Sequence, residues 1–216
     1  MPLPNSIRIR RIAGIAFLAV LSLSNSAYAG VPKTTAATRA TCIAPLIEQP
    51  FLSFKDRRDY VLAPGGSFED PTMPGWSLDD GATVTEGNEP FNVRRSQDRH
   101  SLSLPPGASA TTPKMCVDLN WPTMRFVAAQ LGVKGDGELD VEVLYPEAGE
   151  KKASWHRSKT LKAKLNDGWH ATEDVKMDPT RGGNFAGGRP VALRFTNSAE
   201  KGRWQIDNVY VDPHRR

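Results

Sequence analysis

Apolar and polar residues alternate with a period of two along several short segments of the chain. In residues 138–145 every second position is apolar: Leu139, Val141, Val143 and Tyr145. Successive side chains of a β-strand point to opposite faces, so this pattern predicts a strand with one buried face. The same alternation predicts strands at 161–165 and 191–195, and the residues of 204–211 predict a last strand.

The pattern as a whole predicts an all-β chain. Residues 124–131 are apolar on both faces, which fits either a buried strand or a short helix. No segment shows a sustained helical stripe with capping residues. The candidate strands, about ten over roughly 170 residues, have the spacing of a sandwich or barrel. We therefore predict a two-layer antiparallel β-sandwich that occupies residues 42–216 as a single domain.

The first 29 residues have the pattern of a signal peptide. Three arginines precede an apolar run at residues 12–23, and Ala27-Tyr28-Ala29 supplies the small-x-small motif that a signal peptidase cleaves. We predict cleavage after Ala29 and secretion to the extracellular space. The alternative is an uncleaved membrane anchor, although this apolar run is short for a bilayer.

The residues that follow the predicted cleavage site lack apolar periodicity. Residues 30–41 are rich in Ala and Thr, and we expect them to form a flexible leader. No apolar tail follows the last predicted strand, so we expect no stable membrane anchor.

The net charge changes once the signal peptide is set aside. The full chain carries 28 Lys and Arg against 24 Asp and Glu, a net charge of +4. Three of those arginines lie in residues 1–29, which hold no acid, so the mature chain has a net charge of +1. Nucleic-acid binding needs clustered positive charge on the folded domain. The basic and acidic residues are interspersed, and we predict no nucleic-acid partner.

The chain contains two cysteines, Cys42 and Cys116. In an exported chain an even number of cysteines indicates a disulfide. The alternative is a pair of free thiols, but the sequence has no Cys-x-x-Cys motif and no His close to either cysteine. We predict a Cys42–Cys116 bridge, which would stabilise the fold by about 4 kcal/mol in the chain-entropy description.

Two motifs far apart in the sequence carry a family resemblance. Residues 61–70 read Val-Leu-Ala-Pro-Gly-Gly-Ser-Phe-Glu-Asp, Gly75-Trp76 follows, and residues 204–213 read Trp-Gln-Ile-Asp-Asn-Val-Tyr-Val-Asp-Pro. Together they resemble the first and last strands of galactose-binding-like jelly rolls, which serve as carbohydrate-binding modules in secreted bacterial proteins. The chain is also similar to a group of small secreted bacterial proteins with this fold and no assigned activity. The resemblance covers about residues 60–212, and it implies a jelly-roll fold and glycan binding without catalysis.

The same resemblance implies a structural calcium ion. In many of those modules the acid after Phe and the acid of the last strand bind calcium, and these positions are Glu69 and Asp207 here. Ca²⁺ takes six to eight oxygen ligands, and Asp70 and Asn208 are further candidates. The chain departs from the pattern because Gly65 replaces the usual Asn and Asn208 replaces a second acid. The alternative is that both carboxylates pair with arginine or with turn amides.

The chain has five tryptophans that could stack on sugar rings: Trp76, Trp121, Trp155, Trp169 and Trp204. Trp121 adjoins Pro122 in a predicted turn, and Trp155 lies among polar residues, so we predict that these two are exposed and bind ligand. The alternative for both is a packing role. We expect Trp76 and Trp204 to seal the ends of the sandwich.

The sequence offers little support for catalysis. It has no G-x-S-x-G elbow and no His-Glu-x-x-His motif, although a Ser-His-Asp triad assembled in space stays open. The adjacent acids Asp79-Asp80 and Glu173-Asp174 would point to opposite faces of a strand. We therefore predict a monomeric, secreted, non-catalytic binding module whose partner is an extracellular or cell-wall glycan. The alternative is an extracellular structural or protein-interaction domain without a small-molecule ligand.

Overall fold

The computed structural model describes residues 46–117, 123–132, 137–145, 153–163, 168–177 and 189–212. Among these residues the strands form two antiparallel sheets, one of eight strands and one of six. The single helical segment in these ranges is a short 3-10 helix, η1 (Leu52–Phe54), and it is far too short to cross a membrane. The predicted all-β sandwich is confirmed.

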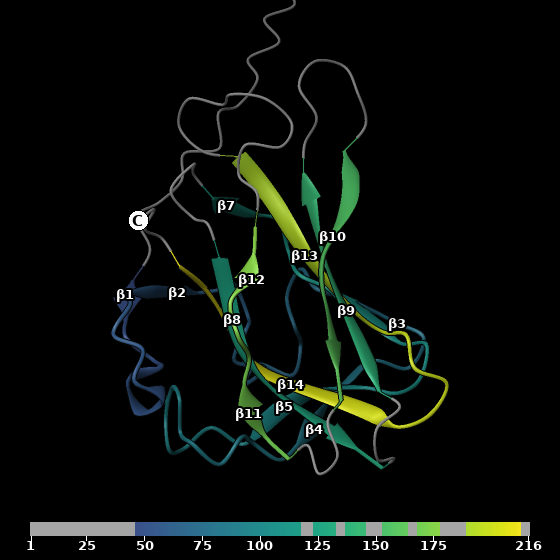
Figure 1. Cartoon of the computed structure of the whole chain (residues 1–216), viewed down its shortest axis with the longest axis horizontal. Coiled ribbons are helices and arrows are strands. Elements are labelled where there is room, and N and C mark those ends of the chain that lie inside the picture. Colours follow the sequence, from purple (N-terminus) through teal and green to yellow (C-terminus); the bar gives the residue numbers. More distant parts are fainter. Residues whose placement is uncertain are drawn as a thin grey trace, which may run out of the picture. The chain divides into compact units, whose positions relative to one another are not determined.

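Each sheet collects strands from distant parts of the sequence (Figure 1). The eight-stranded sheet contains β1 (Ile47–Glu48), β2 (Tyr60–Leu62), β4 (Thr83–Glu86), β5 (His100–Leu104), β8 (Thr123–Leu131), β11 (His170–Ala171), β12 (Val175–Lys176) and β14 (Arg203–Asp212). The six-stranded sheet contains β3 (Ser77–Asp79), β6 (Ser109–Thr111), β7 (Met115–Val117), β9 (Glu138–Tyr145), β10 (Ser154–Lys162) and β13 (Arg189–Asn197).

Strand β14 organises the eight-stranded sheet because it pairs along both edges. One edge pairs with β8 over nearly its whole length. The other edge pairs first with β5, at residues 204–206, and then with β2, at residues 210–211. The β8 register shifts between Asp207 and Tyr210, which marks a β-bulge. This bulge lies where β5 gives way to β2, and it shapes the site described below.

The main core lies between the two sheets. The alternating positions predicted on β9 and β13 are buried and belong to this core. Across the gap between the sheets, Phe126 of β8 meets Phe195 of β13 edge to face, with ring centroids 5.2 Å apart. The apolar segment 124–131, open between strand and helix on sequence grounds, is strand β8.

A second apolar cluster covers the outer face of the eight-stranded sheet. It consists of Phe51, Tyr60, Val93, Val127 and Tyr210, all buried. Val127 and Tyr210 point away from the main core, while their strand neighbours point into it. Strand β8 is therefore apolar on both faces because both faces are covered.

A network of charges joins the segment after η1, which carries Asp56 and Arg58, to strand β8 of the eight-stranded sheet. Arg58 Nη2 lies 2.7 Å from Asp56 Oδ2, and Arg58 also pairs with Asp174. Arg125 of β8 pairs with Asp56, and Tyr60 donates its hydroxyl to Asp56 Oδ2 at 2.7 Å. Although burial alone would raise it, these hydrogen bonds hold the pKa of Asp56 well below its ordinary value. The charges compensate one another, so a partly buried network is stable here.

The strand predicted at 161–165 is placed differently in the structure. Strand β10 begins at Ser154 and ends at Lys162, so only the start of the predicted range belongs to it. A register shift between Arg157 and Lys159 interrupts the alternation that a sequence pattern relies on. Because β10 ends the strand order of the six-stranded sheet (Figure 1), most of its side chains are only half-buried. The alternation of apolar and polar residues is therefore weak over the first part of β10, and the sequence pattern missed it.

Several predictions lie outside the described residues. These are the signal peptide and its cleavage after Ala29, the leader at 30–41, Cys42 and Trp121. Cys116 lies in β7, where its backbone is opposite Pro190, but its side chain is not among those described. The Cys42–Cys116 disulfide therefore stays a prediction.

Candidate functional site

Among the described residues, the outer face of the six-stranded sheet carries polar side chains and one tryptophan. On β9 the residues that alternate with the buried positions point to this face: Glu138, Asp140, Glu142 and Leu144. Neither apolar cluster of the described residues lies on it. Figure 1 shows β10, β9 and β13 side by side, so their outward residues share one surface.

Trp155 of β10 is half-buried on this outer face. It lies directly opposite Leu144 of β9. The Arg194 guanidinium, from β13, lies over the indole with its carbon 4.2 Å from the ring centroid. Arg194 Nε donates to Glu142 Oε2 at 2.7 Å, and Nη2 lies 2.7 Å from the same oxygen. Three strands thus assemble one Trp–Arg–Glu group.

The neighbouring row of the same face is also a compensated polar group. Thr160 donates its hydroxyl to Asp140 Oδ1, and Arg157 Nη2 lies 3.1 Å from Asp140 Oδ2. Further along, Lys162 Nζ lies 3.3 Å from Glu138 Oε1. The described part of the face therefore offers hydroxyl, guanidinium and carboxylate groups beside one aromatic ring.

The other described tryptophans have packing roles. Trp204 is 1% exposed in the main core. Trp76 packs edge to face on Phe68 and donates its Nε1 hydrogen to Pro64 O at 2.8 Å. Trp169 packs against the second cluster, on the opposite sheet. In the described ranges, Trp155 is thus the half-buried tryptophan on the outer face of the six-stranded sheet, which we call the open face. Its predicted role in stacking stays a prediction.

The two acids of the motif pair, Glu69 and Asp207, come from the loop after β2 and from β14. Gly66 holds this loop close to β14, because its oxygen accepts from Val209 N at 2.9 Å. A Cβ on Gly66 would lie 2.8 Å from Val209 O, which a side chain cannot tolerate. The second of the paired glycines is therefore required for the approach that brings Glu69 within electrostatic range of Asp207.

The Glu69 carboxylate is bound to the start of β5. Its Oε1 accepts hydrogen bonds from the amides of Arg99 at 2.9 Å and His100 at 2.8 Å. Its Oε2 lies 3.2 Å from His100 Nδ1. This arrangement matches the alternative in which the carboxylate pairs with backbone amides. Asp70 faces elsewhere and accepts from the amide and hydroxyl of Thr72.

Asp207 is fully buried at the β-bulge of β14. Its Oδ1 accepts from the amide of Asn208 at 2.7 Å, and the amide of Glu89 lies 3.5 Å from its Oδ2. Burial, reinforced by the negative charges of Glu89 and Glu69, raises the pKa of Asp207 to about 8, although the two amides lower it. Burial and the neighbouring negative charges therefore disfavour the ionised form of this carboxyl group.

Glu89 is a member of this site that the sequence did not reveal. It is 2% exposed, and its carboxylate accepts from the amides of Phe91 and Val93. Asn208 Nδ2 donates to its Oε1 at 3.2 Å. The hydrogen bonds from the amides of Phe91 and Val93 lie within the same loop, two and four residues after Glu89. They form only in the folded loop, so no sequence pattern indicates them.

The oxygen atoms around Asp207 fit a hard cation only in part. The side-chain oxygens of Asn208 and Asn88 are buried without a hydrogen-bond partner. Buried carbonyl and carboxylate oxygens are the ligands that Ca²⁺ prefers. In the described ranges, however, no group of three or more His, Cys, Asp or Glu side chains is placed to hold a metal ion. Asp207 and Asn208 thus supply two candidate oxygen ligands, fewer than the six to eight that Ca²⁺ takes, and the Glu69 carboxylate is engaged by amides.

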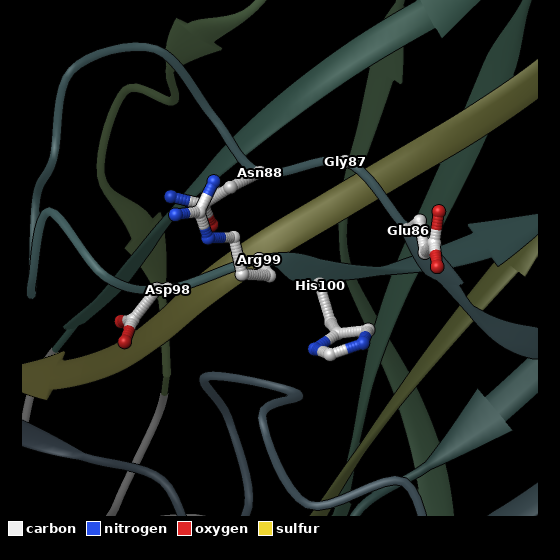
Figure 2. A pocket seen from close by; sticks show the side chains of 6 residues that line it. All are labelled: Glu86, Gly87, Asn88, Asp98, Arg99 and His100. Atoms are coloured by element: carbon white, nitrogen blue, oxygen red, sulfur yellow. The ribbon is translucent and has the colours of Figure 1, made fainter.

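A cavity of about 550 Å³ lies between the ends of β4 and β5. Its lining consists of Glu86, Gly87, Asn88, Asp98, Arg99 and His100. Figure 2 shows Arg99 beside Asn88, while Glu86 and Asp98 lie at opposite ends of the group. An acid–base pair for catalysis needs both groups within reach of one reacting atom. In Figure 2 the two acids of this lining, Glu86 and Asp98, lie apart from one another.

The fold is similar to that of carbohydrate-binding modules. One similar structure holds the CBM22-1 and GH10 modules of xylanase 10B from Clostridium thermocellum, complexed with xylohexaose, with a TM-score of 0.51 and 11% identity. It covers 70% of this chain, and this chain covers 28% of it. Another is the CBM22-1–CBM22-2 tandem domain of Xyn10C from Paenibacillus barcinonensis, with a TM-score of 0.51 and 14% identity over 74% of this chain and 46% of that one.

These similarities establish the fold. The chain is a jelly-roll sandwich of the kind found in carbohydrate-binding modules, which confirms the resemblance drawn from the two motifs. No family model matches the sequence, and no curated protein does. At this low identity, fold carries no ligand with it.

Proposed function

We propose that the chain is a non-catalytic glycan-binding module that binds through the outer face of the six-stranded sheet. The half-buried Trp155 on that face carries this proposal. Sugar rings present apolar C–H faces to aromatic rings and hydroxyl groups to polar side chains. Trp155 supplies the aromatic ring, Arg194 and its partner Glu142 lie beside it, and Asp140 lies further along the same face of β9. The similar structure of xylanase modules complexed with xylohexaose makes a xylan oligosaccharide the first ligand to test.

The proposal includes a place of action outside the cell. The signal-peptide pattern ending at Ala29 supports export, and two cysteines in an exported chain support the Cys42–Cys116 bridge. The partner is then an extracellular or cell-wall glycan, bound by a monomer.

Isothermal titration of the purified protein with soluble xylan and with xylohexaose tests the glycan site. We expect binding by the wild type and a loss of at least about tenfold in affinity for Trp155→Ala. Trp169→Ala is the matched control, because Trp169 packs on the opposite sheet, and it should bind like the wild type. Equal affinity of Trp155→Ala and the wild type, or no binding to any polysaccharide of a broad panel, would contradict the proposal.

We also propose a structural calcium ion at Asp207, with Asn208 and Glu69 as further ligands. Supporting features are the buried, unpartnered Asn208 oxygen and the raised pKa of Asp207. Bound calcium would stabilise the anionic form of Asp207. No chemistry is assigned to the ion.

The calcium proposal is tested by the melting temperature in EDTA and in millimolar calcium. A ligand that binds only the folded protein raises the melting temperature. We expect a rise for the wild type, a smaller rise for Glu69→Ala and none for Asp207→Asn. Asp70→Ala is the matched control and should retain the full rise, because Asp70 bonds to Thr72 instead. The absence of a wild-type rise would refute the calcium site.

One observation favours the second candidate, a protein-interaction domain. Leu52 of η1 and Phe91 of the loop after β4 are 54% and 38% exposed. Phe54 meets Phe91 with ring centroids 4.9 Å apart. Exposed apolar side chains that adjoin one another can serve as a contact surface. Sedimentation analysis separates the two candidates, because self-association lost in Phe91→Ser would favour an interaction domain.

A further inference from the structure

We propose that Arg194 is a positioning residue that, held by Glu142, fixes the Trp155 indole as a platform for an uncharged sugar ring. This inference rests on the proposed glycan-binding function. It states that the Arg194–Glu142 ion pair, which does not stack on the sugar, sets the orientation of the indole. It also restricts the ligand to an uncharged sugar.

The platform is assembled across three strands. Arg194 of β13 lies directly opposite Glu142 of β9, and Trp155 of β10 lies opposite Leu144, two residues further along β9. The guanidinium therefore reaches across β9 to lie over the indole, 4.2 Å from its centroid. Because β9 lies between β10 and β13, only a long side chain such as that of arginine can span this distance to an aromatic ring.

The ion pair restrains Arg194 more than an ordinary surface pair would. Both Nε and Nη2 lie 2.7 Å from Glu142 Oε2, and the two side chains are 31% and 17% exposed. A planar guanidinium fixed in this way presents a flat face to the indole, which an ammonium group cannot do. Trp155 lies on a strand at the end of the sheet order, where it would otherwise have rotamer freedom that binding must remove. Restraining it before the ligand arrives therefore increases affinity.

The stacked guanidinium also limits how a ligand can approach. Arg194 occupies one face of the indole, so at most one face is left for a sugar ring. The sugar ring must then stack on the face of the indole opposite Arg194. The pair therefore limits the ligand through the one face that it leaves open.

The charges around the platform favour an uncharged sugar. Arg194 is paired with Glu142, Arg157 with Asp140 and Lys162 with Glu138. An anionic sugar needs a cation that has no carboxylate partner, since otherwise it must displace one. On the described part of this face, each of these cations already has its acid.

Three variants test the positioning role by titration with xylohexaose. Arg194→Lys keeps the charge but loses the planar stack, and Glu142→Gln leaves Arg194 without its anionic partner. We expect each to weaken binding about tenfold, with the loss appearing as faster dissociation. Lys162→Gln is the matched control, because its pair with Glu138 is exposed and distant from the indole, and it should bind like the wild type. Wild-type affinity in Arg194→Lys would overturn the proposal.

A second measurement examines the platform without any ligand. The indole N–H signal of Trp155 in a two-dimensional NMR spectrum can be assigned by its disappearance in Trp155→Phe. We expect this signal to shift and broaden in Arg194→Lys and in Glu142→Gln but not in Lys162→Gln. An unchanged signal would refute the positioning role even if no glycan binds. Absence of wild-type binding together with a shifted signal would instead refute the glycan function alone.

The ligand class is tested by charge and by salt. Xylohexaose binding should be insensitive to NaCl between about 50 and about 500 mM, because no net charge is neutralised. Polygalacturonate should bind at least about tenfold more weakly than xylohexaose. Tighter, salt-sensitive binding of polygalacturonate would overturn the assignment of an uncharged sugar.

Discussion

The outer faces of the two sheets are built in opposite ways. On the eight-stranded sheet, the segment around η1 and the loop after β4 cover Val127 and Tyr210 with Phe51, Tyr60 and Val93. On the six-stranded sheet, the corresponding face carries Trp155 and paired charges, with no apolar cluster over it among the described residues.

The difference separates stability from binding. Both faces carry arginine–carboxylate pairs with a buried carboxylate, but the cation Arg58 on the covered face is 16% exposed, and the cation Arg157 on the open face is 62% exposed. A charge pair that is removed from water becomes costly to break, whereas an exposed pair contributes little. The covered face therefore behaves as a second core, and the open face can change its side chains at small cost.

The largest expected effect comes from Phe51→Ala on the covered face. Phe51 is fully buried, meets Tyr60 and Tyr210 edge to face, and lies under the Arg125 guanidinium. Truncation should lower the free energy of unfolding by about 3–5 kcal/mol. Urea denaturation measures it, and Trp155→Ala on the open face is the comparison, with an expected loss of about 1 kcal/mol. Equal losses would show that the two faces do not differ.

The next largest effect is expected from Asp56→Asn. Removing this charge takes from Arg58 and Arg125 the more buried of the two carboxylates that they share in this network. The free energy of unfolding should fall by about 3 kcal/mol. Glycan binding by the folded protein should be unchanged, because the network lies on the other sheet. A reduced affinity in titration of the folded variant would contradict the separation of the two faces.

A smaller effect is expected for pH at Asp207, which lies opposite Val127 on the eight-stranded sheet. Its pKa of about 8 in the folded protein exceeds the ordinary value of 3.8, so its contribution is fully present below about pH 4. In EDTA, stability should decline as the pH rises from about 4 through 8, because folding then opposes ionisation beside Glu89 and Glu69. Melting temperatures across this range should decline less in Asp207→Asn. Parallel profiles would show that Asp207 does not titrate in this way.

The smallest effect is expected from Glu142→Gln on the open face. Its pair with Arg194 is partly exposed, so the free energy of unfolding should change by less than about 1 kcal/mol. The same acid-to-amide change as in Asp56→Asn thus isolates the burial of the two networks. Urea denaturation of both variants side by side makes the comparison, and a larger loss for Glu142→Gln would reverse our assignment of the stabilising face.

The strands that were predicted correctly have one buried face and a regular register. Residues 139–145 alternate because β9 pairs without interruption with β13, and residues 191–195 alternate for the same reason. Strand β10 was missed over residues 154–160 because its bulge breaks the period and its position at the end of the sheet leaves no strongly apolar face. The second cluster was hidden as well, since its covering segment has no regular period.

For the candidate sites too, residues that belong to short motifs could be predicted, whereas residues defined by partners far away in the sequence could not. Glu69 and Asp207 could be found because each belongs to a short motif, and the structure brings both to one end of the sheet. Arg194 could not be found, because its relation to Trp155 depends on the register of three strands. Glu89 was missed because its partner Asn208 is more than a hundred residues away.

The position of β14 in the chain has a consequence for how the protein is made. This strand comes last among those described, yet β2, β5 and β8 all pair with it. A growing polypeptide that lacks residues 203–212 has no strand to join these three, so its sheet edges stay open. Such long-range pairing also folds slowly. The nascent chain should therefore stay unfolded until synthesis has passed Asp212, and a ribosome stalled before that point should hold a protease-sensitive polypeptide.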